Sequence, residues 1–131
     1  MSLKFRNRDF KGLELPEGLH DRYVDLSRIG FTGIGWDFEG ALEFINFLNL
    51  SSFVVLGGET YRVQNGKYIL SWKYDWAFTN EELLIDEGFM ERNKRQAIDK
   101  ITNFENEAKA NGEKLVYRIS SGSLEWLKSF E

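Results

Sequence analysis

The dipeptide Asn65-Gly66 is the sequence feature that most limits how this chain can fold. A two-residue turn of type I′ needs positive φ angles at both central residues, and Asn followed by Gly adopts them more readily than other pairs. Residues 60–72 around the dipeptide are rich in β-branched and aromatic residues, and Tyr61 and Val63 alternate with polar neighbours. This alternation indicates one covered and one solvated face. The sequence therefore predicts a β-hairpin, and with it an antiparallel sheet.

Two helices are indicated by apolar residues that recur at spacings of three and four. The first, over 38–49, has Asp37 as its N-cap and Trp36 in the place of a hydrophobic staple. A helical pattern resumes at Asn80 and becomes a long helix over 89–110, one stripe of which we expect to face the core. That stripe contains Met90, Ala97, Ile98, Ile101, Phe104 and Ala108.

Short apolar runs between these helices and after them predict strands. The expected strands are 53–56, 60–64, 67–72 and 113–119. We expect the first of them to end in a bend at Gly57-Gly58. At the other end of the chain, Ser121 or Ser123 is placed to cap a short terminal helix.

The order of these elements is typical of an α+β fold. A chain of 131 residues has the size of one ordinary domain, so we expect a single domain over 1–131. Residues 1–35 hold the only proline, Pro16, and several glycines, which indicates a loop-rich segment. The sequence thus predicts a mainly antiparallel sheet with two main helices packed on one face and a short C-terminal helix.

Composition argues against several classes of site. The chain has no cysteine and one histidine, so it offers no disulfide, thiol nucleophile or Cys- or His-rich metal site. His20 precedes Asp21, but no nucleophile motif accompanies the pair, and we interpret His20 as an ordinary surface or turn residue. Neither Gly33-x-Gly35 nor the later double glycine fits a phosphate-binding loop. We therefore expect no catalytic residues, no metal and no cofactor.

Charge and hydropathy bear on partners and location. The net charge is −4, which has the wrong sign for a protein that follows a phosphate backbone. No apolar span reaches eighteen residues, and the N-terminus lacks the core of a signal peptide. The expectation is a cytoplasmic protein that binds neither nucleic acid nor a membrane.

The most uneven feature is the acidic segment, residues 75–91. It contains Asp75, Glu81, Glu82, Asp86, Glu87 and Glu91 and has no lysine or arginine, so its charge is −6 while the rest of the chain sums to +2. Acidic residues complement the start of a helix, and a charged face is often merely solvated. The same carboxylates are equally able to steer a basic partner. Paired carboxylates for glycoside hydrolysis are a third reading, although nothing in the sequence fixes two of them at a working separation.

Aromatic residues make up 15% of the chain, and we assign most of them to the core. Three tryptophans are candidates for exposure: Trp72, Trp76 and Trp126. Trp76 is the candidate for a binding surface, whereas a core position is favoured for Trp126. Glu59 follows the double glycine, where a tight bend would display its side chain in a fixed direction.

The stretch from Trp36 to Phe104 resembles a known family. The residues that carry the resemblance are Ala41-Leu42 and Ile45, Val55 to Tyr61, Gly66, Asp75-Trp76, and Ala97, Ile101 and Phe104. They resemble immunity-protein family forty, small bacterial proteins encoded beside polymorphic or contact-dependent toxins and inferred to neutralise them. Asn93 stands where that family is expected to have a serine. The resemblance implies no catalytic residues and no cofactor, and it implies that the protein acts by stoichiometric occlusion of a toxin.

Two hypotheses of different kinds follow, with a small enzyme as a weaker third. In the first, an immunity protein binds a cognate and basic toxin domain through an acidic surface with an aromatic anchor. The residues assigned to that surface are Glu59, Asp75, Trp76, Glu81, Glu82, Asp86 and Glu87. In the second, the chain is a carbohydrate-type binding module that uses exposed tryptophans around a cleft.

Overall fold

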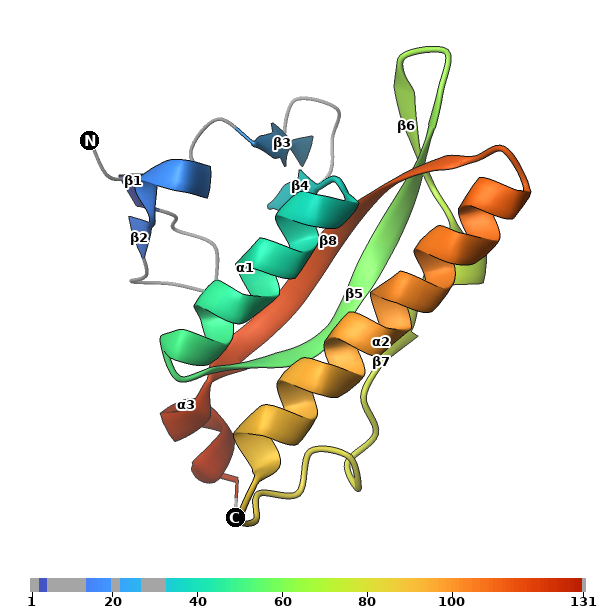
Figure 1. Ribbon diagram of the computed structural model, residues 1–131. Coiled ribbons are helices and arrows are strands. Elements are labelled where there is room, and N and C mark those ends of the chain that lie inside the picture. The colour runs from blue at the N-terminus through green and yellow to red at the C-terminus, as the bar shows by residue number, and fades with distance from the viewer. Residues whose placement is uncertain (1–2, 5–13, 20–21, 27–32, 131) are drawn as a thin grey trace.

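A computed structural model describes residues 3–4, 14–19, 22–26 and 33–130. Its helices are α1 (Phe38–Leu50), α2 (Phe89–Ala110) and α3 (Leu124–Lys128), with 3-10 turns η1 (Glu17–Leu19) and η3 (Trp72–Tyr74). Its strands are β1 (Leu3–Lys4), β2 (Glu14–Leu15), β3 (Tyr23–Asp25), β4 (Ile34–Trp36), β5 (Phe53–Gln64), β6 (Lys67–Leu70), β7 (Trp76–Ala77) and β8 (Lys114–Ser123). Figure 1 shows α1 and α2 side by side on one face of the sheet, so the predicted α+β class is confirmed.

All strand pairs described are antiparallel. The main sheet has the order β3-β4-β8-β5-β6, β7 pairs with β5, and β1 and β2 form a separate small pair. Strands β5 and β8 are the longest and lie next to each other at its centre, under both long helices (Figure 1). The segment expected to be loop-rich, residues 1–35, contributes β3 and most of β4 to the sheet.

The expected break at Gly57-Gly58 is wrong, because β5 continues through both glycines. The pairing with β8 shifts register between Val55 and Gly57, which marks a β-bulge. A Cβ atom on Gly57 would lie 2.5 Å from the backbone oxygen of Trp76, and one on Gly58 would lie 2.5 Å from that of Arg118. The glycines allow neighbouring backbones to approach this closely, and they do not end the strand.

The hairpin at Asn65-Gly66 is confirmed. The φ angles of these residues are 52° and 75°, as a type I′ turn requires. Strand β6 ends at Leu70 and not at residue 72 as expected. The chain leaves the sheet there because it enters η3, which buries Tyr74 against Phe104 of α2 with ring centroids 5.3 Å apart.

The core between the helices and the sheet contains most of the stripe predicted on α2. Met90 is an exception, because it is only partly buried and the neighbouring Phe89 is buried instead. In α2, Ala97, Ile101 and Ala108 are buried, and Ile98 and Phe104 pack partly against them. The start of the long helix is also as expected, but residues 80–88 form turns and not the helical lead-in that the pattern indicated. A second, smaller cluster on the opposite face of the sheet contains Leu26, Tyr61 and Val116.

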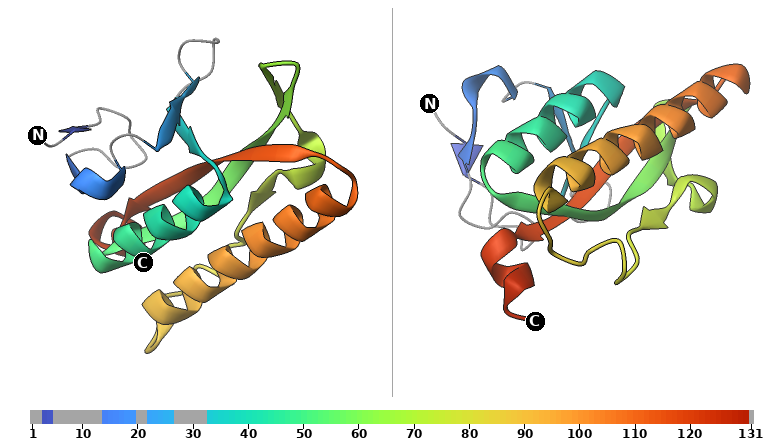
Figure 2. Two further views of the ribbon diagram at one scale, coloured as in Figure 1. Left: turned by 45° about the horizontal axis from the view of Figure 1, so that its top comes forward. Right: turned by 60° about the horizontal axis from the view of Figure 1, so that its bottom comes forward.

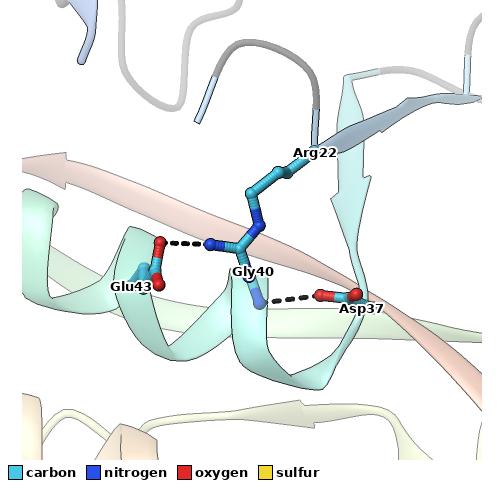
Figure 3. A network of polar contacts seen from close by, with 4 residues as sticks. All are labelled: Arg22, Asp37, Gly40 and Glu43. Atoms are coloured by element: carbon cyan, nitrogen blue, oxygen red, sulfur yellow. Dashed lines mark hydrogen bonds and ion pairs between the residues drawn. The ribbon is translucent and has the colours of Figure 1, made fainter. Parts of the chain in front are cut away.

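The start of α1 is fixed by its predicted N-cap. The Asp37 carboxylate accepts a hydrogen bond of 2.7 Å from the backbone N–H of Gly40. Trp36, just before the cap, stacks on Phe44 with ring centroids 4.9 Å apart. Arg22, just before β3, forms an ion pair with Glu43 in the second turn of α1. Figure 3 shows this ion pair and the Asp37–Gly40 hydrogen bond at the start of α1.

We expect the substitution Ile101→Ala to lower the free energy of unfolding by about 2–5 kcal/mol, because it leaves a cavity in the core between α2 and the sheet. Chemical denaturation measures this loss. Asn103→Ala, at an exposed position two residues further along α2, is the control and should have little effect. A loss below about half a kcal/mol for Ile101→Ala would show that this stripe does not support the core.

Candidate functional site

The acidic segment begins one residue before β7, includes the turns over 79–88 and ends in the first turn of α2. Figure 1 shows this stretch, in yellow, at the same end of the molecule as α3, and the right-hand view in Figure 2 shows the two from another direction. Three of its six carboxylates have hydrogen-bond or ion-pair partners within the chain, and the other three have no ion pair among the described residues. The first three hold the segment in shape, whereas the other three are available to a partner.

Glu82 belongs to the set with internal partners. Its carboxylate accepts a hydrogen bond of 2.9 Å from the backbone N–H of Thr79, and the Thr79 hydroxyl accepts one of 3.1 Å from the N–H of Glu82. This reciprocal capping box holds a single turn, and the backbone hydrogen bond from Thr79 lowers the pKa of Glu82. Glu82 therefore stabilises the shape of the segment.

Asp86 and Glu91 are paired with cations that lie just outside the acidic segment. Arg92 donates to Asp86 at 2.8 Å and also to the backbone oxygen of Leu84 at 3.0 Å. Glu91 lies 3.5 Å from Lys94 on the next turn of α2. Arg92 thus ties the turns over 79–88 to the first turn of α2 at two points.

The remaining carboxylates are Asp75, Glu81 and Glu87. All three are exposed, and within the described part of the chain none has an ion pair. Glu81 and Glu87 flank the turn that Glu82 and Arg92 hold in place. Two negative charges therefore project from a fixed piece of backbone.

Glu59 lies elsewhere, on the face of the sheet opposite the helices. It faces Arg118 of β8 across the ladder, with 3.2 Å between the carboxylate and the guanidinium. The negative charges of Glu59 and Asp75 both raise the pKa of Tyr61. The predicted site residues do not form one cluster: Glu59 lies on the β5–β8 ladder, Asp75 and Trp76 lie at the start of β7, and the others lie on the turns over 79–88.

The tryptophans agree with expectation only in part, since Trp72 is exposed as expected. Trp76 is half-buried, because its ring packs edge-on against Phe78 at 5.3 Å and lies over Gly58. Trp126, for which a core position was favoured, is 47% exposed, and this prediction is wrong. The reason is that α3 lies at the surface and none of its residues is buried.

An apolar groove that the sequence analysis missed lies beside Trp126. Its volume is about 550 Å³. The lining includes Leu56, Phe78, Leu83, Leu84, Trp126 and Phe130. The sequence signal for this groove is the apolar run at 83–85 inside the acidic segment. Three consecutive apolar residues do not follow helical periodicity, so they need another explanation.

This geometry bears on the carbohydrate hypothesis. Trp72 is 77% exposed on η3, yet neither it nor Trp76 lines the groove. The groove therefore has one of the three candidate tryptophans and not a set of aromatic platforms around one cleft.

The described residues include no group of three or more His, Cys, Asp or Glu side chains that could hold a metal ion. His20 lies outside the described residues. In the part of the chain that the structure describes, no helix has both the length and the apolar character needed to cross a membrane.

Alkaline pH should weaken the fold through Tyr61. Burial, followed by the charge of Glu59, raises the pKa of Tyr61 from 10.0 to about 12. The unfolded chain therefore loses this proton first, and the free energy of unfolding should fall as pH rises from about 10 towards 12. We expect Tyr61→Phe to make that decline shallower in denaturation measured at each pH.

Part of the decline should remain in Tyr61→Phe, because burial also raises the pKa of Tyr117. An equally steep decline in the variant and the wild type would show that Tyr61 is not ionised preferentially in the unfolded state.

The family model described as immunity protein 40 matches residues 25–120, which is more than half of the chain. The matched range includes β5, most of β8, both long helices and the acidic segment. No curated protein matches the chain.

Proposed function

Because the chain belongs to the immunity protein 40 family, we propose that it binds a cognate toxin domain one to one and neutralises it by occluding a surface that the toxin needs for its activity. Toxin neutralisation is the general role of an immunity protein family. The family match is the observation that carries the proposal. The finer points, which are stoichiometric occlusion, a basic toxin and a cytoplasmic location, are our inference.

Binding without catalysis is consistent with how the buried polar groups are used. The Asn93 amide hydrogen-bonds the backbone of Val55, and the Thr60 hydroxyl donates to the backbone oxygen of Tyr74 at 2.8 Å. The largely buried Arg118 contacts Glu59 and Ser120. These three side chains therefore serve contacts within the fold, as buried polar groups generally do.

The acidic segment favours a basic toxin surface. Glu81 and Glu87 are exposed on a turn that internal hydrogen bonds already hold, so they need no rearrangement before contact. Fixed charges of one sign raise the rate of encounter with an oppositely charged partner. Asp75 supplies a third exposed charge, but it lies just before β7 and not on that turn. We therefore place the electrostatic part of the interface first at Glu81 and Glu87.

The test is the association rate with the toxin encoded beside this protein, for a variant carrying Glu81→Lys and Glu87→Lys. At low ionic strength we expect association to slow by on the order of tenfold, because steering charges are reversed. The difference should shrink as salt is raised, since exposed charges are then screened. This choice spares Glu82 and Asp86, whose reversal would break contacts inside the protein.

A matched control carries Glu39→Lys and Asp99→Lys, which change the net charge by the same amount at exposed positions on α1 and α2. We expect the control to associate much more nearly like the wild type, and circular dichroism should show both variants folded. If the two variants slow association equally, total charge and not the turn over 79–88 governs encounter. If neither does, the interface lies elsewhere.

A further inference from the structure

The groove beside Trp126 has two walls from distant parts of the chain. One wall is the stretch 80–85 and the other is α3 with the residues after it, while Leu56 from the bulge of β5 and Phe78 also line it. Figures 1 and 2 show that the yellow stretch and α3 lie at the same end of the sheet. At about 550 Å³ the groove is in the size range of ligand sites, and large enough for a bulky apolar side chain.

Large apolar side chains are left exposed around this groove. Leu84 is 63% exposed, Trp126 is 47% exposed and Phe130 is 70% exposed. Trp126 and Phe130 meet edge to face with their ring centroids 5.0 Å apart, so they form a continuous aromatic surface. A clustered apolar patch on a protein surface marks an interaction site far more often than scattered single residues do.

Both walls are held in place without a partner. Ser123 caps α3 by accepting from the N–H of Trp126 at 3.0 Å, and the N–H of Leu124 donates to the backbone oxygen of Ser52 at 2.8 Å. The Trp126 ring also lies against Gly122, where a Cβ atom would come within 2.7 Å of the ring. On the other wall, Arg92 holds the backbone at Leu84. A site formed in advance binds with a smaller loss of conformational entropy.

The charges around the groove identify the kind of occupant. The two walls and the turn that continues the first of them, residues 80–88 and 124–130, contain five acidic residues and one basic residue. They are Glu81, Glu82, Asp86, Glu87, Glu125 and Lys128. Arg92 pairs with Asp86, and the other four carboxylates leave a net negative charge in the chain segments that form the groove. Charge complementarity therefore favours a partner segment with lysine or arginine beside the apolar side chain that enters the groove.

We propose that this groove receives a large apolar side chain from a basic segment of the toxin, and that it is the anchor of the interface. The inference rests on the proposed function and gives that function a location. The role of Trp76 as the aromatic anchor passes to Trp126, because Trp76 is already packed against Phe78 and Gly58.

An anchor and a steering charge affect different rate constants. Loss of a desolvated apolar anchor mainly speeds dissociation, whereas reversal of rim charges mainly slows association. The groove can therefore be tested separately from Glu81 and Glu87.

The experiment measures association and dissociation rates of the toxin with Trp126→Ala and with Leu84→Ala, one from each wall. We expect each to raise the dissociation rate by about tenfold or more, with a small change in association. Trp72→Ala is the matched control, because Trp72 is the most exposed tryptophan and lies outside the groove, and it should dissociate like the wild type. Leu84→Ala guards against a folding defect, since Leu84 is largely exposed.

The outcomes separate the two proposals. If the wild type binds the toxin and all three variants dissociate at the wild-type rate, the groove assignment is wrong and the proposed function stands. If the wild type does not bind the toxin at all, the proposed function fails and the groove assignment fails with it. If the wild type self-associates without toxin in sedimentation equilibrium and Trp126→Ala abolishes this, a second copy occupies the groove and the toxin anchor is overturned.

Discussion

The rest of the structure depends on how the outer edge of β5 is satisfied. One edge of β5 pairs with β8 along almost its whole length, and the other edge is open to any backbone that can reach it. The chain that follows β5 returns along this edge. Strand β6 pairs with β5 first, and the N–H of Ser71 then donates a hydrogen bond to the backbone oxygen of Thr60. Strand β7 pairs next, and the N–H of Phe78 donates to the backbone oxygen of Leu56. The chain is thereby led along β5 from the hairpin to the bulge. It reaches the turns over 79–88 at the end of the sheet where the N–H of Leu124 donates a hydrogen bond to the backbone oxygen of Ser52.

Asn93 completes the same edge where no strand is available. Its side chain accepts from the N–H of Val55 at 2.9 Å and donates to the oxygen of Val55 at 3.0 Å, in place of a strand partner. An unsatisfied buried backbone group costs about 1–3 kcal/mol, so a polar residue is needed at this point of α2. The contact also fixes α2 against the bulge, and Leu56, next to Val55, lines the groove. Fold and candidate site therefore share one structural cause.

The elements that could be predicted from the sequence are those set by local spacing. Asn65-Gly66 determines the hairpin through its own φ angles, and the stripe on α2 follows from helical periodicity. The continuation of β5 through Gly57-Gly58 could not be predicted, because it depends on the close approach of β7 and β8. The exposure of Trp126 depends on the tertiary position of α3, none of whose residues is buried. The sequence showed the concentration of acidic residues over 75–91 but not how many of their charges are free. Arg92 and Lys94, just beyond the segment, pair with two of its six carboxylates.

The central claim is that the turns over 79–88 and α3 lie together at the end of β5 that carries the bulge, and that they form the surface that binds the toxin. Hydrogen–deuterium exchange of the protein, alone and saturated with its cognate toxin, tests this claim most directly. The account predicts slower exchange in the complex for backbone amides at 79–88 and 124–130, with the hairpin tip around Asn65 unchanged. Protection confined to the hairpin tip or to α1, with 79–88 and 124–130 unchanged, would contradict it.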